Sequence, residues 1–179
     1  MEEAKVIALV RAGEVNAFAG IIEHYQTPII RYLFRLTGDY EMAKDLAQDT
    51  FIQAYKGILK TSAELSFKAW LYRIATNNAF QHSRRKKLLS FIPFTSRERD
   101  IPIADDRPDC PEEIAAIQEA LLKIPEEQRT CVVLHFVEGF KYREIAETLK
   151  VSEEAVRKRV ARGRKLFIEM YNRGGGGTA

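Results

Sequence analysis

The stretch "KYREIAETLKVSEEAVRKRVARGRKLF", residues 141–167, decides the fold of the C-terminal part of the chain. Its first half predicts a short helix ending near Lys150, with small or aliphatic side chains facing inward: Ile145, Ala146 and Leu149. Val151 anchors the tight turn that follows. Ser152 is a good N-cap for a second helix, because its hydroxyl can accept a hydrogen bond from an unpaired backbone N–H.

The second helix of this stretch combines an apolar inner face with a basic outer face. Val156 and Val160 are four residues apart and share the inner face, while Glu153 and Glu154 stand in the first turn, where the helix dipole favours acids. Six cations cover the remaining surface: Arg157, Lys158, Arg159, Arg162, Arg164 and Lys165. This layout is typical of a helix-turn-helix, whose second helix enters the DNA major groove. A basic helix against a membrane or an acidic protein is the alternative, and the matching register of the inward residues favours DNA.

The net charge of +3 conceals four blocks of alternating sign. Counting Lys and Arg against Asp and Glu, the net charges are −1 for residues 1–60, +6 for 61–99, −7 for 100–138 and +5 for 139–179. Two basic blocks separated by an acidic one predict two footprints on one polyanion.

Four of the six prolines lie between residues 93 and 111, where a long helix is therefore excluded. Elsewhere, apolar residues recur at three- and four-residue spacings, and strand and hairpin signals are nearly absent. The sequence therefore predicts an all-α fold of two small helical domains joined by a proline-rich linker. The expected boundaries are 1–88 and 112–172 for the domains, 89–111 for the linker and 173–179 for a flexible glycine-rich tail.

Composition narrows the class of protein. The chain has 179 residues, 46% of them hydrophobic, but no apolar run of the roughly 18 residues that a membrane span needs. The first residues lack the basic flank and cleavage site of a signal peptide, and Cys110 and Cys131 form no CxxC pair, so we expect a cytoplasmic protein with reduced thiols. Catalytic Ser/His/Asp spacing and phosphate-cradling glycine loops are absent, and we interpret Cys131, His135 and Phe136 as core or partly buried.

The N-terminal half predicts amphipathic helices, with Gly38 at a helix end and Asp39 as the cap of the next helix, whose buried stripe should contain Met42, Leu46, Phe51 and Tyr55. A further helix starts near Phe67 and turns Phe67, Trp70, Leu71, Ile74 and Ala75 inward. Its polar side carries Arg73, Thr76, Asn77, Gln81 and Arg84 at spacings of three or four. Amides and guanidinium groups can read bases and sugar-phosphate, and the cations Arg84, Arg85, Lys86 and Lys87 can neutralise phosphates.

The segment "DLAQDTF", residues 45–51, places Asp45, Gln48 and Asp49 on one helix face. Two carboxylates could hold a metal, but no histidine or third acid lies within helical reach, and His24 and His82 are distant in sequence. An acidic patch in a DNA-binding chain is better interpreted as a contact for a basic protein surface.

These motifs together resemble a known family. "DLAQDTF", "FKAWLYRIATNNA…RRKK" and "EIAETLKVSEEAVRKRVARGR" occur in the order seen in bacterial extracytoplasmic-function (ECF) sigma factors, over roughly residues 5–170. The resemblance implies two helical domains, sigma regions 2 and 4. It also implies a transcription initiation subunit that binds core RNA polymerase and promoter DNA, has no catalytic residues, cofactor or metal of its own, and is held inactive by an anti-sigma factor.

The resemblance also implies roles for individual residues. Asp45, Gln48 and Asp49 would dock on the clamp helices of the polymerase β′ subunit, and the β flap would be a second polymerase contact. The −10 element would be read, and an extruded base held, by Lys60, Thr61, Ser62, Ala63, Glu64, Arg73, Asn77, Asn78, Gln81, Arg84 and Arg85. The −35 element would be met by Ser152, Glu154, Ala155, Arg157, Lys158 and Arg162.

Two departures from the family pattern leave the −10 base preference open. Many members have aspartate where this chain has Gln81, and the loop from Lys60 to Ser66, "KTSAELS", lacks the glycine and arginine often found there. Two other classes of protein are alternatives. A stand-alone helix-turn-helix regulator with an N-terminal dimerisation or sensing domain would bind a palindrome without polymerase, and a nucleic-acid enzyme would need metal ligands that the sequence lacks.

Overall fold

The computed structural model describes residues 3–58, 66–89 and 111–174, and all regular structure in these ranges is helical. The chain divides into two compact units: Met1–Leu33 with Glu41–Ile92, and Phe34–Tyr40 with Pro93–Ala179. The expected all-α fold of two small helical domains is confirmed. No helix in the described ranges combines the length and the apolar character needed to cross a membrane.

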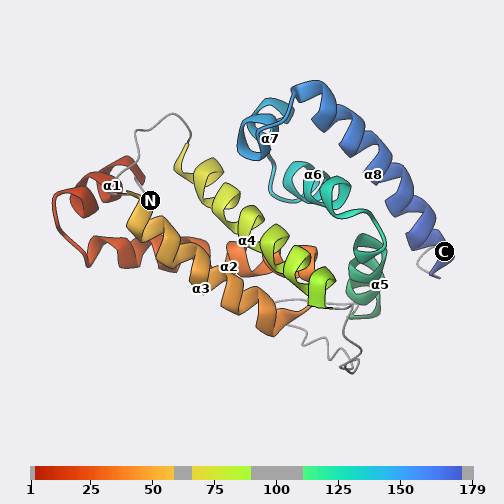
Figure 1. Cartoon of the computed structure of the whole chain (residues 1–179), viewed down its shortest axis with the longest axis horizontal. Helices are drawn as coiled ribbons and strands as arrows, with labels where there is room; N and C mark the ends of the chain where they lie inside the picture. Colours follow the sequence, from red (N-terminus) through yellow and green to blue (C-terminus); the bar gives the residue numbers. More distant parts are fainter. Residues whose placement is uncertain (1–2, 59–65, 90–110, 175–179) are drawn as a thin grey trace. The chain divides into compact units, whose positions relative to one another are not determined.

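Four helices build the N-terminal half: α1 (Glu3–Arg11), α2 (Ala17–Thr37), α3 (Tyr40–Ile58) and α4 (Phe67–Leu89) (Figure 1). Rings from α2 and α4 form much of its core, because Tyr32 contacts Tyr72 at 5.0 Å and Tyr25 contacts Phe67 at 5.8 Å between ring centroids. The helix start at Phe67 and the positive φ of Gly38 at the end of α2 agree with the sequence expectations.

The side chains expected inside α3 are buried to different degrees. Leu46 and Phe51 are buried, whereas Met42 and Tyr55 are only half-buried. Helix α1, which the sequence patterns did not single out, is tied to the first unit by Tyr25, whose hydroxyl donates to the Glu3 carboxylate. Burial and this contact raise the pKa of Tyr25 above its usual value.

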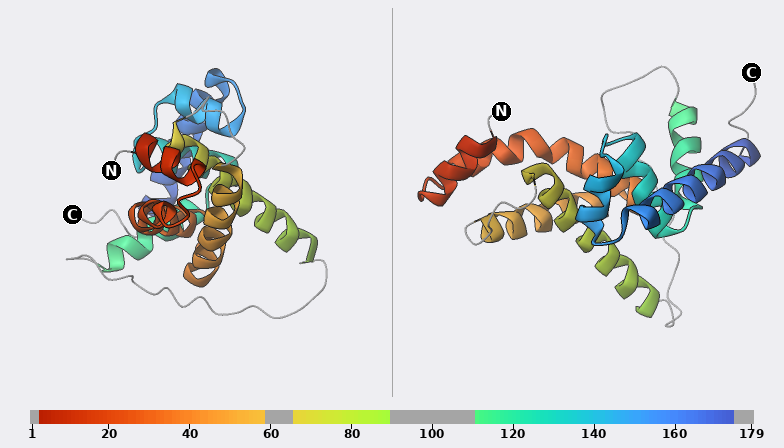
Figure 2. Two further views of the ribbon diagram at one scale, coloured as in Figure 1. Left: turned by 90° about the vertical axis from the view of Figure 1, so that its left-hand side faces the viewer. Right: turned by 90° about the horizontal axis from the view of Figure 1, so that it is seen from above.

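The second unit contains α5 (Pro111–Leu122), α6 (Glu126–Phe136), α7 (Tyr142–Leu149) and α8 (Glu153–Arg173). Helix α8 packs against each of the other three (Figures 1 and 2). The centre of the core consists of fully buried side chains: Val133, Leu134, Ile145 and Val156. Helices α7 and α8 flank a tight turn in which Lys150 adopts the left-handed conformation with φ of 55°.

The turn confirms the helix-turn-helix geometry expected from the sequence. The Ser152 hydroxyl caps α8 by accepting from the Ala155 backbone N–H at 3.1 Å. Val156 and Val160 face the interior, as does Ala146. Gly163, which the sequence analysis did not single out, allows the close approach of α8 to α6: a Cβ there would lie 2.7 Å from a Val132 methyl group.

The interpretation of Phe136 as core or partly buried was wrong. Cys131 is fully buried and His135 is partly buried, but Phe136 is 56% exposed. The inner side of α6 is already filled by the run from Cys131 to Leu134, and Phe136 is the last residue of the helix, so its ring lies outside the core, against His135.

Candidate functional site

The acidic face of α3 is open to solvent. Asp45, Gln48 and Asp49 are all exposed, and Asp45 lies three residues before Gln48 and four before Asp49, so one side of the helix presents two carboxylates and an amide. The remaining face of α3 carries the buried side chains of Leu46 and Thr50. The spacing expected from the sequence therefore produces a continuous polar surface.

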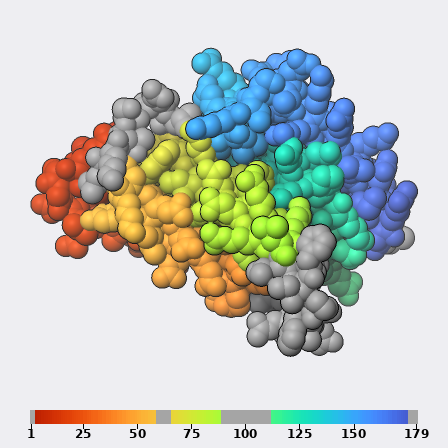
Figure 3. All heavy atoms as spheres, viewed as in Figure 1, coloured from red at the N-terminus to blue at the C-terminus, as the bar shows by residue number. Residues whose placement is uncertain are grey.

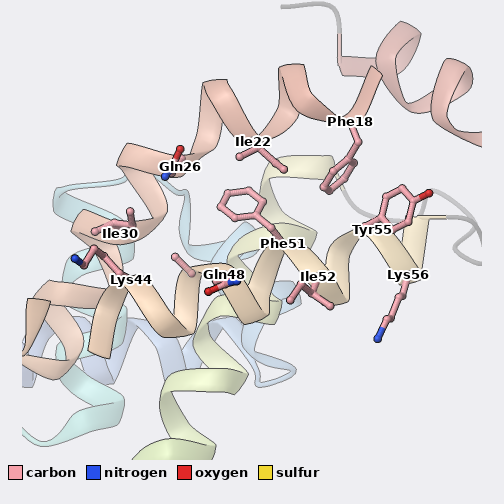
Figure 4. A pocket seen from close by; sticks show the side chains of 11 residues that line it. Phe18, Ile22, Gln26, Ile30, Lys44, Gln48, Phe51, Ile52, Tyr55 and Lys56 are labelled. Carbon is pink, nitrogen blue, oxygen red and sulfur yellow. The ribbon is translucent and has the colours of Figure 1, made fainter. Parts of the chain in front are cut away.

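Beside this acidic face runs a mostly apolar groove of about 520 Å³ between α2 and α3 (Figure 4). Its walls contain Phe18, Ile22, Gln26, Ile30, Lys44, Ala47, Gln48, Phe51, Ile52, Tyr55 and Lys56. Gln48 belongs both to the groove and to the acidic face, and Ile52 is 45% exposed at the groove. Sequence reasoning missed the groove, because its two walls come from different helices. The available signal was Ile52, an apolar residue three positions after Asp49 and four after Gln48, and so on the polar side of the helix.

Helix α4, drawn yellow to green in Figure 3, has several polar and basic side chains that are open to solvent. Asn77, Gln81, Arg84 and Arg85 are exposed, and Arg73 is half-buried. The sequence of α4 contains no acidic residue. Arg84, Arg85 and Lys86 are exposed and form no ion pair with another residue in the part of the chain that the structure describes.

Two polar residues expected on this outer side of α4 lie in the core instead. Thr76 is 1% exposed and Asn78 is 6% exposed. A helix turns by about 100° per residue, so the positions before and after Asn77 point to either side of the outward row. Thr76 bonds Tyr32 at 2.7 Å, and Asn78 bonds Thr50 at 3.1 Å. The assignment of Asn78 to the DNA-facing surface is therefore corrected.

The segment before α4 is only partly described. The expected contacts at Lys60, Thr61, Ser62, Ala63 and Glu64 lie outside the described residues. Ser66, the last residue of the "KTSAELS" segment, is described, and its hydroxyl accepts from the Ala69 backbone N–H at 3.2 Å. Ser66 therefore helps to start α4, which is a structural role.

Ion pairs between successive turns organise the exposed side of α8. Glu153 pairs with Arg157 at 2.7 Å and Glu154 pairs with Lys158 at 2.6 Å. The Arg157 guanidinium also lies 5.9 Å from the centre of the Tyr142 ring, on α7. Arg162 is exposed one turn further along the helix. The two ion pairs lie along the exposed surface of the helix.

Not every cation of α8 faces outward. Arg159 pairs with Glu127 of α6 at 2.6 Å and is only partly exposed. It also lies beside the buried thiol of Cys131, whose pKa is raised by burial to about 11 although Arg159 lowers it. Arg159 thus ties α8 to α6. Ser152 and Ala155 are likewise engaged in the helix cap, although Ser152 remains exposed.

The described residues contain no group of three or more histidine, cysteine or acidic side chains placed to hold a metal ion. What the surfaces offer is two separate basic helices and one acidic helix face beside an apolar groove. This arrangement suits the binding of a nucleic acid and of a protein. It defines a two-domain, helix-turn-helix DNA-binding protein.

Comparison with known proteins identifies the family. The profile of sigma-70 region 2 matches residues 21–88, and that of sigma-70 region 4 matches residues 114–167. The ECF RNA polymerase sigma factor SigW of Bacillus subtilis is 31% identical over 174 residues, covering 91% of this chain and 93% of SigW. The ECF RNA polymerase sigma factor SigM of Mycobacterium tuberculosis is 32% identical, covering 94% of this chain and 84% of SigM.

Solved structures share the fold. The sigma factor RpoE in complex with the anti-sigma factor NepR, from Bartonella quintana, superposes with a TM-score of 0.73 at 21% identity, covering 87% of this chain and 96% of that one. CnrH in complex with the cytosolic domain of CnrY gives a TM-score of 0.70 at 22% identity, covering 93% and 95%. The chain belongs to the ECF family of RNA polymerase sigma factors, and its function is to bind core polymerase and direct transcription initiation at promoter DNA.

Proposed function

We propose that three surfaces of this sigma factor bind three different targets: core polymerase, the −10 element and the −35 element. The acidic face of α3 is proposed to dock on core polymerase. Asp45 and Asp49 are exposed and stand beside the apolar groove between α2 and α3. A charged rim next to an apolar groove is the usual composition of a protein interface. The proposed partner is a basic surface on the clamp helices of the β′ subunit, and the β flap is proposed as a second contact.

The second surface is the outer row of α4, proposed to meet the −10 element. Asn77 and Gln81 carry the donors and acceptors that base edges or sugars require, and Arg84 and Arg85 extend the row with charges for phosphates. Arg73 begins the same row. The segment from Lys60 to Glu64 is proposed to hold a base extruded from the opened −10 DNA.

The third surface is the exposed side of α8, proposed to read the −35 element. Arg157, Lys158 and Arg162 project from a helix that is capped by Ser152 and packed by Val156. Entry of this second helix into the major groove would bring its first turns to base edges. Glu154 and Ala155 lie in those turns.

An anti-sigma factor is the proposed regulator. Two solved structures with this fold are complexes: the sigma factor RpoE is bound to the anti-sigma factor NepR, and CnrH is bound to the cytosolic domain of CnrY. A protein that covered the α3 face would prevent polymerase binding. The proposed site of action is the cytoplasm, where core polymerase performs the chemistry and this chain contributes no catalytic residue.

Reconstituted transcription tests the promoter assignment. Purified chain and bacterial core polymerase are incubated with fragmented genomic DNA, and the 5′ ends of the transcripts are sequenced. We expect new starts that share two upstream motifs about two DNA turns, roughly 70 Å, apart. Absence of chain-dependent starts, with tight binding of the free chain to a palindrome, would instead indicate a stand-alone regulator.

Charge reversal tests the docking surface. The variant Asp45→Lys/Asp49→Lys should bind core polymerase about tenfold or more weakly, since close charge pairs across an interface couple strongly. The matched control is Glu112→Lys/Glu113→Lys, which makes the same charge change at exposed residues of α5, in the second unit. Circular dichroism monitors the fold. Equal affinity of both variants for core polymerase would remove α3 as the docking site.

Substitutions in α8 test the −35 assignment. Arg157→Ala and Arg162→Ala should each reduce transcription from a −35-dependent promoter. The expected cause is a loss of about 1–3 kcal/mol of DNA-binding free energy for each lost base contact. Binding to core polymerase should be unchanged. Normal transcription by both variants would show that another element reads the −35 DNA.

A further inference from the structure

The buried amide of Asn78 joins α4 to α3 through two hydrogen bonds. Its Nδ2 donates to Thr50 Oγ1 at 3.1 Å, and its Oδ1 accepts from Gln53 Nε2 at 3.0 Å. Thr50 Oγ1 in turn donates to the Leu46 carbonyl at 2.7 Å. A single α4 side chain thus bridges two turns of α3, in a chain of donors that all run in one direction.

An amide at this buried position destabilises the core unless its donor and acceptor groups are aligned with partners. Asn78 is 6% exposed, and a buried amide destabilises a core unless both its donor and its acceptor are paired. A leucine would fill a similar volume without that requirement. Apolar contacts have no preferred direction, whereas hydrogen bonds near 3 Å require one alignment of donor and acceptor.

The bridge connects the two surfaces to which the proposed function assigns different partners. On α3, Leu46 and Thr50 directly follow Asp45 and Asp49 of the docking face. On α4, Asn78 directly follows Asn77 of the outer row. A slip of α4 by one residue would rotate that row by about 100° and shift it by about 1.5 Å relative to α3.

We propose that Asn78 is a positioning residue: its amide fixes the register of the DNA-facing row of α4 against the polymerase-docking face of α3. The inference rests on the proposed roles of these two faces. Core polymerase holds α3, and the Asn78 bridge transmits that position to Asn77, Gln81 and Arg84. Opening of the −10 DNA therefore depends on Asn78, although Asn78 does not touch DNA.

The test compares two variants that each break a buried hydrogen bond of α4. Asn78→Leu removes the bridge to α3 and leaves Thr50 bonded to the Leu46 carbonyl and Gln53 exposed to water. Thr76→Val removes the bond from α4 to Tyr32 of α2. Both variants should lose stability, so the control accounts for a purely structural role. Open complexes are counted per bound holoenzyme, by permanganate reactivity of unpaired thymines, at a temperature where both variants are fully folded.

We expect Asn78→Leu to form about five- to tenfold fewer open complexes, the factor that corresponds to one buried hydrogen bond, while core affinity stays within about twofold. Thr76→Val should form as many open complexes as the unmodified chain. Equal open-complex yields for the two variants would overturn the proposal and leave Asn78 a structural residue. Loss of core affinity by Asn78→Leu alone would also overturn it, since the bridge would then maintain the docking face.

Gln53 provides a second test of the bridge. It is exposed, so Gln53→Ala removes one hydrogen bond with little effect on packing. The double variant Gln53→Ala/Asn78→Leu should form no fewer open complexes than Asn78→Leu alone, because both substitutions break the same link. Additive losses would overturn the proposal.

A distance measurement separates this inference from the proposed function. Spin labels are placed on the free chain by Gln48→Cys and Gln81→Cys, with Cys110 and Cys131 replaced by alanine. The label-to-label distance distribution should broaden in Asn78→Leu and stay narrow in Thr76→Val. An unbroadened distribution in Asn78→Leu overturns the inference whatever the transcription assay shows, whereas failure of the unmodified chain to direct transcription refutes the proposed function alone.

Discussion

Helices α4 and α8, the two proposed to face DNA, are held in their units by different chemistry. In α4, buried polar side chains bond neighbouring helices, through Thr76 to Tyr32 and through Asn78 to Thr50. In α8, the inner face is apolar, and Gly163 allows α6 to approach closely. Their outer faces differ as well, because α4 contains no acid whereas α8 pairs its first-turn glutamates with cations one turn later.

The difference shows two ways of fixing a basic helix. Close packing around a glycine fixes α8 by shape, so its position is sensitive to added volume. Hydrogen bonds hold α4 and are sensitive to the loss of a donor or acceptor while volume is kept; we expect the Asn78 bonds to set its position against α3 and the Thr76 bonds to contribute stability. The substitutions and titrations below separate these two cases.

The largest expected effect is an increase in volume at the α8–α6 contact. Gly163→Val should lower the free energy of unfolding of the second unit by about 1–3 kcal/mol, because even a Cβ would lie 2.7 Å from the Val132 methyl group. Urea denaturation followed by circular dichroism measures the change. The paired variant Gly163→Val/Val132→Ala should recover part of the loss. An unchanged midpoint would show that α8 is not held by close packing at this position.

The next effect is the loss of the Thr76 hydroxyl in the α4 core, which bonds Tyr32 at 2.7 Å and donates to the Tyr72 carbonyl at 2.7 Å. Thr76→Val keeps the volume but removes a buried hydroxyl that bonds a side chain of α2, which should cost about 1–3 kcal/mol of unfolding free energy. Adding Tyr32→Phe should restore part of that loss, because neither of the two side chains then carries a hydroxyl. A double variant that is less stable than Thr76→Val would contradict the hydrogen-bond account of α4.

Alkaline pH should affect the α8–α6 contact through Cys131. Burial raises the pKa of its thiol to about 11, so the unfolded chain loses this proton at lower pH than the folded chain does. The free energy of unfolding is then unchanged by this group below about pH 9 and falls by about 1.4 kcal/mol per pH unit as pH rises toward 11. Denaturation curves at several pH values measure the slope. Cys131→Ala should show a smaller slope, and an equal slope would exclude the thiol as its cause.

The smallest expected effect concerns the outer charges. Arg84 of α4 has no acidic partner among the described residues, and Arg84→Gln should reduce the salt dependence of promoter binding by about 0.7–0.9 in the logarithmic slope, the value for one phosphate contact. Arg143→Gln is the control, because Arg143 pairs with Glu147 on α7, outside the proposed DNA surfaces. Equal slopes for the two variants would remove Arg84 from the phosphate-binding row.

The helix-turn-helix was the most predictable part of the molecule. The turn at Lys150, the cap at Ser152 and the inward valines Val156 and Val160 all follow from residues within a few positions of each other. Local backbone preferences and helical periodicity are sufficient for such features. The position of Asp45 and Asp49 on one exposed face of α3 followed from the same periodicity.

The failures have a common physical origin. Thr76 and Asn78 are polar, and polarity alone did not reveal that partners from other helices satisfy them in the core. Phe136 is apolar, and apolarity alone did not reveal that the core was already filled. In each case a residue's environment depends on side chains distant in sequence.

The sequence by itself determined the helices, the turn, the order of the charge blocks and the motifs that mark an ECF sigma factor, because these depend on residue type and short spacing. Only the tertiary structure decided which polar groups are buried, that Arg159 serves α6, and that a groove lies between α2 and α3. Burial and hydrogen-bond pairing are properties of the packed helices together, and no single segment contains them.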